Sequence, residues 1–248
     1  MSEATESAPS NLMSLQGQQK QDVTNELAVM QRLLKLDGAR VLELGCGAAD
    51  KTRQLAEQTP VSDIVAVEID PIQHEKNIRI SDLPKVTFKS YGAEEIAEPD
   101  ASFDIVLMFK SLHHVPEDCL DQALEEIHRV LKPGGQAYFS EPVFAGPYNE
   151  IMRLFHDEQQ VRAEAFSALQ RAVDSPLFDL QEEYFFRNVV KLKSWEQYQH
   201  GILNVTHTDH QLSDDVLAEV KRRFMTHQGD QGFVFEIPNR VDVLRRTD

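Results

Sequence analysis

Cysteine is scarce in this chain, which has two, Cys46 and Cys119, among 248 residues. Cys46 lies inside a glycine-containing turn, so we expect no structural disulfide, and a reducing compartment fits this composition. The sequence also has no apolar run near the ~20 residues that span a membrane, and its first residues lack the apolar core of a secretory signal. We therefore expect a cytoplasmic protein without a membrane partner.

Positive charge is scarce as well. Lys and Arg number 25 against 41 Asp and Glu, which gives a formal net charge of −16. Phosphate backbones are bound by cationic surfaces, so this balance argues against a nucleic-acid partner. An acidic surface favours solubility and does not by itself identify a substrate.

The most informative segment is residues 41–50, which read VLELGCGAAD. It contains two glycines and lacks the third glycine of a dinucleotide-binding turn. The apolar start predicts a buried strand, and Gly45 and Gly47 allow a sharp turn close to a ligand before a helix begins near Ala49. A dinucleotide-binding turn would have glycine at position 50, where Asp50 would instead repel a pyrophosphate. The sequence also has no G-x-x-x-x-G-K-[ST] string, which argues against a P-loop. The turn therefore predicts an adenosine-containing cofactor other than a dinucleotide.

Four segments occur in a characteristic order: VLELGCGAAD (41–50), IVAVEID (64–70), the stretch 91–117 ending in HHVPE, and LKPGGQAYFSEP (131–142). The second closes on Glu68, about 20 residues beyond the first, where a ribose-binding carboxylate is expected. Over residues 38–143 the chain resembles the class I S-adenosylmethionine (SAM)-dependent methyltransferases, in particular the small-molecule methyltransferase domains that include ubiquinone-type enzymes.

The resemblance implies an α/β fold, a Rossmann-like doubly wound seven-stranded sheet that is mostly parallel with one antiparallel strand, plus helical cap insertions. We expect a flexible tail over 1–17 and a single domain over 18–248. Within that domain, 38–143 would bind the cofactor, while 144–173 and 191–230 would form the cap over the acceptor. The periodicity predicts strands at 40–44, 64–68, 85–89, 103–109, 136–140, 181–190 and 232–244, and helices at 20–36, 49–58, 71–80, 117–131, 147–173, 194–204 and 213–226.

SAM is the implied cofactor, and the resemblance assigns residues to each part of it. Glu68 would hold the ribose hydroxyls, Ile69 would pack on the adenine, and Phe109 would lie near the methionine part. The family's adenine-contacting Asp is replaced here by Gly92, which leaves the adenine edge to Ala93 and Glu94. The methionine and ribose end would be shaped by Glu43, Gly45, Cys46 and Gly47, with Cys46 contributing its backbone.

Candidate bases follow two of the predicted strands: His113 and His114 after 103–109, and Glu141 after 136–140. Histidine titrates near neutral pH and suits proton abstraction, although each of these groups can equally serve as a cap or bind backbone. Other polar or aromatic candidates can line an acceptor pocket or pack in a core: Tyr148, Asn149, His156, Trp195 and Tyr198. Residues 206–210 (THTDH) can bind a metal or form a solvated loop, and we expect no metal.

The expected function is transfer of a methyl group from SAM to a small-molecule acceptor by in-line displacement. Most of the rate in such a reaction can come from positioning and exclusion of water, so no universal catalytic motif is expected. Two alternatives stay open: a non-catalytic module that binds SAM or S-adenosylhomocysteine (SAH), and the same fold using a SAM derivative in another transfer. The acceptor, the methylated atom and the oligomeric state are not specified by these motifs.

Overall fold

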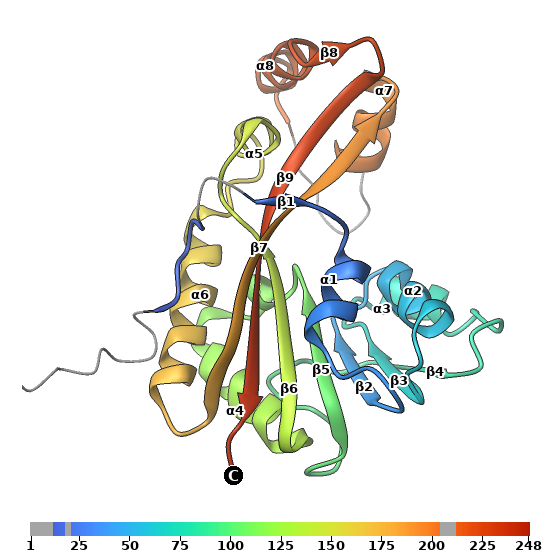
Figure 1. The fold of residues 1–248 in the computed structure, drawn as a ribbon. Coiled ribbons are helices and arrows are strands. Elements are labelled where there is room, and N and C mark those ends of the chain that lie inside the picture. The colour runs from blue at the N-terminus through green and yellow to red at the C-terminus, as the bar shows by residue number, and fades with distance from the viewer. Residues whose placement is uncertain (1–11, 18–20, 204–211) are drawn as a thin grey trace, which may run out of the picture.

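A twisted, mostly parallel sheet runs through the computed structural model, which describes residues 12–17, 21–203 and 212–248 (Figure 1). Its strands are β1 (Asp22–Val23), β2 (Arg40–Leu44), β3 (Asp63–Val67), β4 (Val86–Lys89), β5 (Phe103–Phe109), β6 (Leu131–Pro142), β7 (Phe178–Leu192), β8 (Gln228–Gly229) and β9 (Gly232–Arg246). The order across the sheet is β1-β7-β9-β6-β5-β2-β3-β4, with β8 paired to β9. The strand β9 is antiparallel to its neighbours β6 and β7, while β2 through β6 pair in parallel.

Seven of these strands form the predicted doubly wound sheet with one antiparallel member, so the predicted fold class is confirmed. The described strands number nine because β1 and β8, two residues each, extend the sheet at its margins. Such short strands depend on their partners and carry no alternating pattern of their own, so the predicted count of seven was wrong by these two.

Helices cover both faces of the sheet (Figure 1). On one side lie α1 (Glu26–Leu33), α2 (Asp50–Gln58) and α3 (Pro71–Asn77). On the other lie α4 (Leu120–Val130) and α6 (Gln159–Asp174). In α4 the buried residues Leu120, Leu124 and Ile127 recur at helical spacing, which gives one apolar stripe facing the sheet. The α4 and α6 side shares one hydrophobic core, and the α1 and α2 side shares another.

Two of the predicted helices differ most from the observed ones. The predicted helix 20–36 begins only at Glu26, because the Asn25 side chain caps it by accepting a hydrogen bond from the Ala28 N–H, and the preceding segment pairs with β7 as β1. The predicted helix 147–173 is divided into α5 (Pro147–Met152) and α6. The break places Glu158 against His113, a long-range contact that helical spacing cannot show.

Residues 12–17 lie against the sheet although their composition is typical of a tail. Met13 is buried in the core under α4 and α6, and the Ser14 N–H donates to Glu183 on β7. Residues 1–11 lie outside the described part of the chain, so for them the tail stays a prediction.

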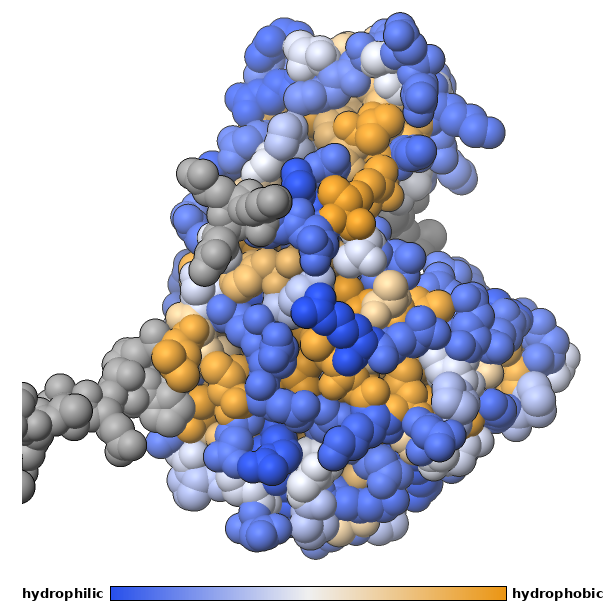
Figure 2. All heavy atoms as spheres, in the orientation of Figure 1, coloured by the Kyte–Doolittle hydropathy of each residue, from blue (hydrophilic) through white to orange (hydrophobic). Residues whose placement is uncertain are grey.

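The far halves of β7 and β9 extend beyond the sheet and form an upper lobe with α5, α7 (Trp195–Tyr198) and α8 (Asp214–Met225) (Figure 1). The predicted helix 194–204 is α7 followed by a π-helix, Gln199–Leu203. The lobe has its own aromatic core, which includes Trp195, Tyr198, Phe224, Phe233 and Phe235. In Figure 2 apolar residues gather in the middle of the visible face, where this lobe meets the sheet.

Candidate functional site: two joined clefts at the strand ends

The site lies where the strand order reverses between β2 and β5, because chain connections leave this point in opposite directions and open a crevice. Here the β2–α2 turn has three left-handed residues, Gly45 (φ 73°), Gly47 (φ 52°) and Ala49 (φ 63°). A Cβ on Gly45 would come within 2.7 Å of the Ser111 Cβ, so this position excludes a side chain on steric grounds. The N–H groups of Gly45 and Cys46 donate to the Val67 carbonyl, which fixes the turn against β3.

The larger cleft has a volume of about 730 Å³, which is within the range of small-molecule sites. It brings together predicted cofactor residues from four separate segments: Gly45, Gly47, Glu68, Ile69, Ala93, Glu94 and Phe109. His114 also lines this cleft, whereas Glu43 and Cys46 line a neighbouring one.

Glu68 has both carboxylate oxygens aligned by backbone. Its Oε2 accepts from the Gly47 N–H at 2.7 Å, and its Oε1 accepts from the Asp70 N–H at 2.9 Å. The carboxylate therefore joins the end of β3 to the β2–α2 turn and faces the cleft in one orientation. Such a carboxylate retains lone pairs for ligand hydroxyl groups.

Gly92 makes room for a neighbouring carboxylate. A Cβ at position 92 would overlap the Glu94 carboxylate, which folds back over this glycine. The space that an aspartate side chain at this position would fill is therefore occupied by the acid of Glu94. A carboxylate is therefore present beside position 92 although the residue there is glycine.

Glu43 lies beneath the turn. It is 1% exposed, and the Thr52 hydroxyl donates to its carboxylate at 2.7 Å. Burial raises the pKa of Glu43 to about 7, against the smaller lowering by Thr52 and Lys51. The Cys46 thiol is also buried, and burial raises its pKa, so it stays protonated at neutral pH. Both residues line the smaller cleft, and Glu43 joins the end of β2 to α2 through Thr52.

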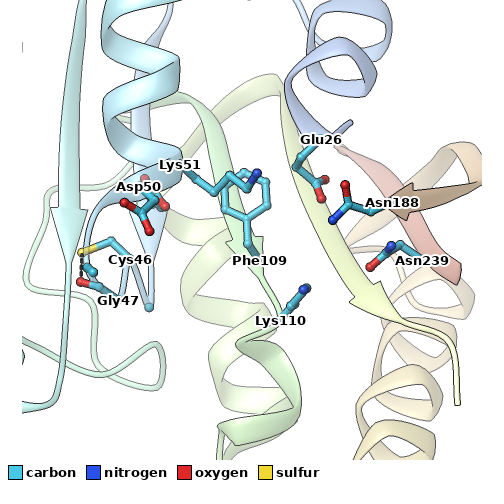
Figure 3. Close-up of a pocket in the computed structure, with 12 residues that line it drawn as sticks. Glu26, Cys46, Gly47, Asp50, Lys51, Phe109, Lys110, Asn188 and Asn239 are labelled. Carbon is cyan, nitrogen blue, oxygen red and sulfur yellow. Dashed lines mark hydrogen bonds between the residues drawn. The ribbon is translucent and has the colours of Figure 1, made fainter. Parts of the chain in front are cut away.

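A smaller cleft of about 270 Å³ adjoins the first (Figure 3). The two share the turn residues 45, 47 and 48 and the end of β5, Phe109 and Lys110. Its far wall is formed by Glu26 of α1, Asn188 of β7 and Asn239 of β9. Sequence reasoning missed Lys110, Asn188 and Asn239. The available signal for Lys110 was a cation directly after the apolar strand 103–109.

Glu141 and His114, two of the predicted proton-transfer residues, lie in different positions relative to the clefts. Glu141 is buried, lines neither cleft, and accepts from the Leu112 N–H at 3.1 Å while pairing with His113 Nδ1. It therefore holds the loop after β5. His114 lines the larger cleft, with its ring 4.2 Å from that of His113.

His113 is held between carboxylates, since its Nε2 lies 3.4 Å from Glu158 Oε1 while Nδ1 pairs with Glu141. Burial by itself lowers the pKa of His113, but Glu141 and Glu158 outweigh it and raise the pKa to about 9. Burial and the adjacent charge on His113 lower the pKa of His114, which favours its neutral form. Ligand atoms of His113, His114 and Glu158 lie within 4.8 Å of one another. Both nitrogens of His113 face carboxylates, so this group is an ion-pair network.

The remaining candidates lie outside the clefts. Tyr148, Trp195 and Tyr198 pack in the upper lobe. Asn149 is buried in α5, and His156 Nε2 lies 2.7 Å from Glu158 Oε1. Residues 206–210 lie outside the described part of the chain.

Comparison with known proteins agrees with this geometry. A family model described as a methyltransferase domain matches residues 41–135. A demethylmenaquinone methyltransferase of Lactobacillus johnsonii is 35% identical over 122 residues, 47% of this chain and 48% of that one. A 27-O-demethylrifamycin SV methyltransferase of Amycolatopsis mediterranei is 35% identical over 103 residues, 40% of this chain and 37% of the relative. The chain thus spans about half or less of the curated relatives it matches.

Solved structures with a similar fold cover more of this chain than the family model does. The YcgJ protein of Bacillus subtilis covers 90% of this chain and 98% of its own, with a TM-score of 0.59 at 16% identity. The [4+2]-cyclase SpnF covers 89% of this chain and 78% of its own, with a TM-score of 0.55 at 19% identity.

The fold is that of the class I SAM-dependent methyltransferases. Residues 41–135 are a methyltransferase domain of this class, and fold and family together imply SAM as the methyl donor. No helix in the described residues is both long enough and apolar enough to span a membrane.

Proposed function

We propose that this protein transfers a methyl group from SAM to a small-molecule acceptor. The observation that carries the proposal is the pair of joined clefts: one of cofactor size beside the β2–α2 turn, and a second meeting it at Phe109 and Lys110. One cleft would take the donor and the other the acceptor, so that two reactants meet at the end of β5. The small-molecule acceptors in the names of the two curated relatives support the same class of substrate.

When bound, SAM supplies a methyl group already activated on a sulfonium. The chain's own residues then bind, orient and exclude water. Glu68 would accept hydrogen bonds from the ribose hydroxyls, Ile69 and Ala93 would contact the adenine, and Glu94 would accept from the adenine amino group. Gly45, Gly47 and Phe109 would bound the space around the sulfonium, with Glu43 and Cys46 on the side of the smaller cleft. His114, in its neutral form beside charged His113, is the predicted acceptor of a proton.

The upper lobe is the part of the structure that favours a cap over the acceptor. Residues of β7, β9 and α1 wall the smaller cleft. The far halves of the same strands β7 and β9 carry the upper lobe, which also holds α5 and α7 (Figure 1). Of the predicted cap segments 144–173 and 191–230, α5 and the upper-lobe helices α7 and α8 stand in this lobe, whereas α6 packs on the sheet with α4. We propose that the parts in the lobe enclose the acceptor and exclude water from the reacting atoms. The negative charge supports the absence of nucleic-acid partners, and the two free cysteines support a cytoplasmic location.

Calorimetric titration of the purified protein with SAM, and separately with NAD, tests the cofactor. We expect micromolar SAM binding and no NAD binding. The Glu68→Ala variant should bind SAM more than tenfold more weakly, because a hydrogen-bonded charged group contributes about 1.5–3 kcal/mol. Glu75→Ala on α3, outside both clefts, is the matched control and should bind as the wild type does. Wild-type affinity in Glu68→Ala would contradict the ribose assignment, and NAD binding would contradict the cofactor.

The likeness to SpnF favours keeping one other candidate, the same fold with a reaction other than methylation. Product mass separates the two: a gain of one methyl group per acceptor supports the methyltransferase. Tight SAM binding without any transfer across a metabolite panel would favour a regulatory module.

A further inference from the structure

Lys110 is the unexplained residue of the site. It directly follows β5 and adopts φ 53°, one of three positive φ values at non-glycine residues in the described chain. The other two belong to alanines, and any residue with a Cβ pays on the order of 1–2 kcal/mol in this conformation. The Lys110 N–H donates to the Ser140 carbonyl at 2.8 Å, which holds the strained backbone in place.

No residue in the described part of the chain forms an ion pair or hydrogen bond with the Lys110 ammonium. The Lys110 side chain is solvent-exposed where it borders both clefts, and charged residues of neighbouring elements surround it. Glu26 of α1 and Glu141 of β6 favour its charge, whereas Lys51 of α2 and Arg162 of α6 oppose it. Burial is the largest effect, and the net result is a lowered pKa for Lys110.

Asn239 gives a second, independent sign of a ligand in the smaller cleft. It is 2% exposed, its Nδ2 donates to the Ile237 carbonyl at 2.8 Å, and its Oδ1 has no hydrogen-bond partner among the described residues. Buried polar atoms without partners are rare in native structures. Figure 3 shows Asn239 and Asn188 across the cleft from Phe109, with Lys110 between them and the cofactor turn.

A cation without a partner and an amide oxygen without a donor define the missing group. The cation needs an oxygen that can carry negative charge, and the amide oxygen needs an N–H or O–H donor. A hydroxylated ring or enol with an ionisable hydroxyl and a further donor meets both needs. A purely cationic acceptor would leave the Lys110 ammonium facing a like charge.

We propose that Lys110 is the catalytic residue on the acceptor side, and that the acceptor is a compound whose ionisable phenolic or enolic hydroxyl is methylated. The inference rests on the proposed function. In the step, the hydroxyl proton passes to the unprotonated form of the Lys110 amine, the resulting ammonium faces the phenolate oxygen, and a lone pair of that oxygen forms the new C–O bond. The methyl–sulfur bond breaks with its electron pair remaining on sulfur. This assignment moves the proton-accepting role from His114, which borders only the larger cleft.

The test uses the intact protein saturated with SAH, and 4-nitrophenol as the probe, because the ionised form of this phenol is coloured. In the wild type, bound 4-nitrophenol should ionise about one pH unit below the free compound, since a charged Lys110 stabilises the anion. Lys110→Met should abolish this shift, and Lys110→Arg, which keeps the charge, should retain most of it. Lys51→Met, a matched lysine on the opposite wall of the same cleft, should retain it. SAH affinity should change less than about twofold in Lys110→Met.

Three outcomes would overturn the inference. One is a wild-type protein that binds SAH but does not bind or shift 4-nitrophenol. Another is a shift that persists in Lys110→Met. The third is a tenfold loss of SAH affinity in Lys110→Met that is absent for decarboxylated SAM, which would place the ammonium on the cofactor carboxylate. Failure of the wild type to bind SAH is a different result and contradicts the proposed function itself. Lys110→Arg keeps the test valid if Lys110→Met does not fold.

Discussion

At the residue scale, the cofactor cleft depends on carboxylates whose partners lie in other segments. Glu68 joins the end of β3 to the turn after β2, and Glu94 fills the space left by Gly92. The sequence indicates that acids occur at these positions. Their orientation follows from backbone groups that only the fold brings within hydrogen-bond distance.

The Glu94 carboxylate occupies the space beside Gly92, which leads to a prediction for substitutions at these two positions. Glu94→Ala should weaken SAM binding about tenfold, because it removes the acid that we propose accepts from the adenine amino group. Adding Gly92→Asp to that variant should restore most of the affinity, since the new carboxylate takes the vacated space. Calorimetric titration measures both. Gly92→Asp alone, which crowds the Glu94 side chain, is the control, and equal affinity in Glu94→Ala and wild type would sink the assignment.

At the scale of elements, the β2–α2 turn and the loop after β5 fit each other closely. Gly45 lies against Ser111, whose hydroxyl donates to the Leu44 carbonyl at 3.0 Å. Gly47 has a similar φ, but a Cβ there would meet nothing within 4 Å. The two glycines therefore differ in steric crowding while sharing the backbone conformation.

This difference predicts unequal costs for the same substitution. Gly47→Ala should destabilise the ligand-free protein by about 1 kcal/mol, the cost of a left-handed alanine. Gly45→Ala adds an overlap with the Ser111 Cβ and should cost about 2–3 kcal/mol. Urea denaturation of the two variants gives the comparison. Equal losses of unfolding free energy in the two variants would mean that Ser111 moves away from the new methyl group at no energetic cost.

The loop after β5 and the start of α6 are joined by His113, whose pKa of about 9 lies above its ordinary 6.5. A raised pKa contributes stability below pH 6.5, and this contribution is lost as the pH rises through 9. Wild-type stability should therefore fall over pH 6.5–9 by about 3 kcal/mol at most through this group. His113→Gln should remove the slope in urea denaturation.

His128→Gln is the control for that measurement, because burial lowers the pKa of His128 and its contribution changes only below pH 6.5. A slope that survives in His113→Gln would mean that another group titrates there.

At the scale of the whole molecule, segments distant in the sequence are held together by tertiary contacts. Residues 12–17 reach β7 through Ser14 and Glu183, and Met13 is 8% exposed within a core formed by α4, α6 and the sheet. The upper lobe is likewise built by the far ends of β7 and β9 with α5 and α8. The N-terminal segment and the lobe are thus held by tertiary contacts.

Met13→Ala should destabilise the protein by about 2 kcal/mol, because it opens a cavity in a packed core. Leu12→Ala is the matched control, since the neighbouring Leu12 is 70% exposed and should change stability by less than about 0.5 kcal/mol. Both are measured by urea denaturation at fixed pH. Wild-type stability in Met13→Ala would show that residues 12–17 contribute nothing to the folded state.

The sequence by itself determined the elements whose signals are local. The strands Arg40–Leu44 and Phe103–Phe109 have the bounds predicted from their mostly apolar sequences, and the glycine turn follows the first of them. A buried parallel strand needs a continuous apolar run, so its pattern is complete within the segment. The SAM-type cofactor followed from the same local motifs taken in order.

Only the tertiary structure decided which side chains meet. The break that frees Glu158 to pair with His113, the strand β1 on β7, and the wall formed by Asn188 and Asn239 all join residues far apart in the chain. Glu141 carries a typical signature of a strand-end acid, yet its partners on the β5 loop turn it away from both clefts. Lys110 became a candidate because the fold places a strained lysine where the two clefts meet, and its side chain has no ion-pair or hydrogen-bond partner among the described residues. Such facts depend on packing between segments, which no local pattern encodes.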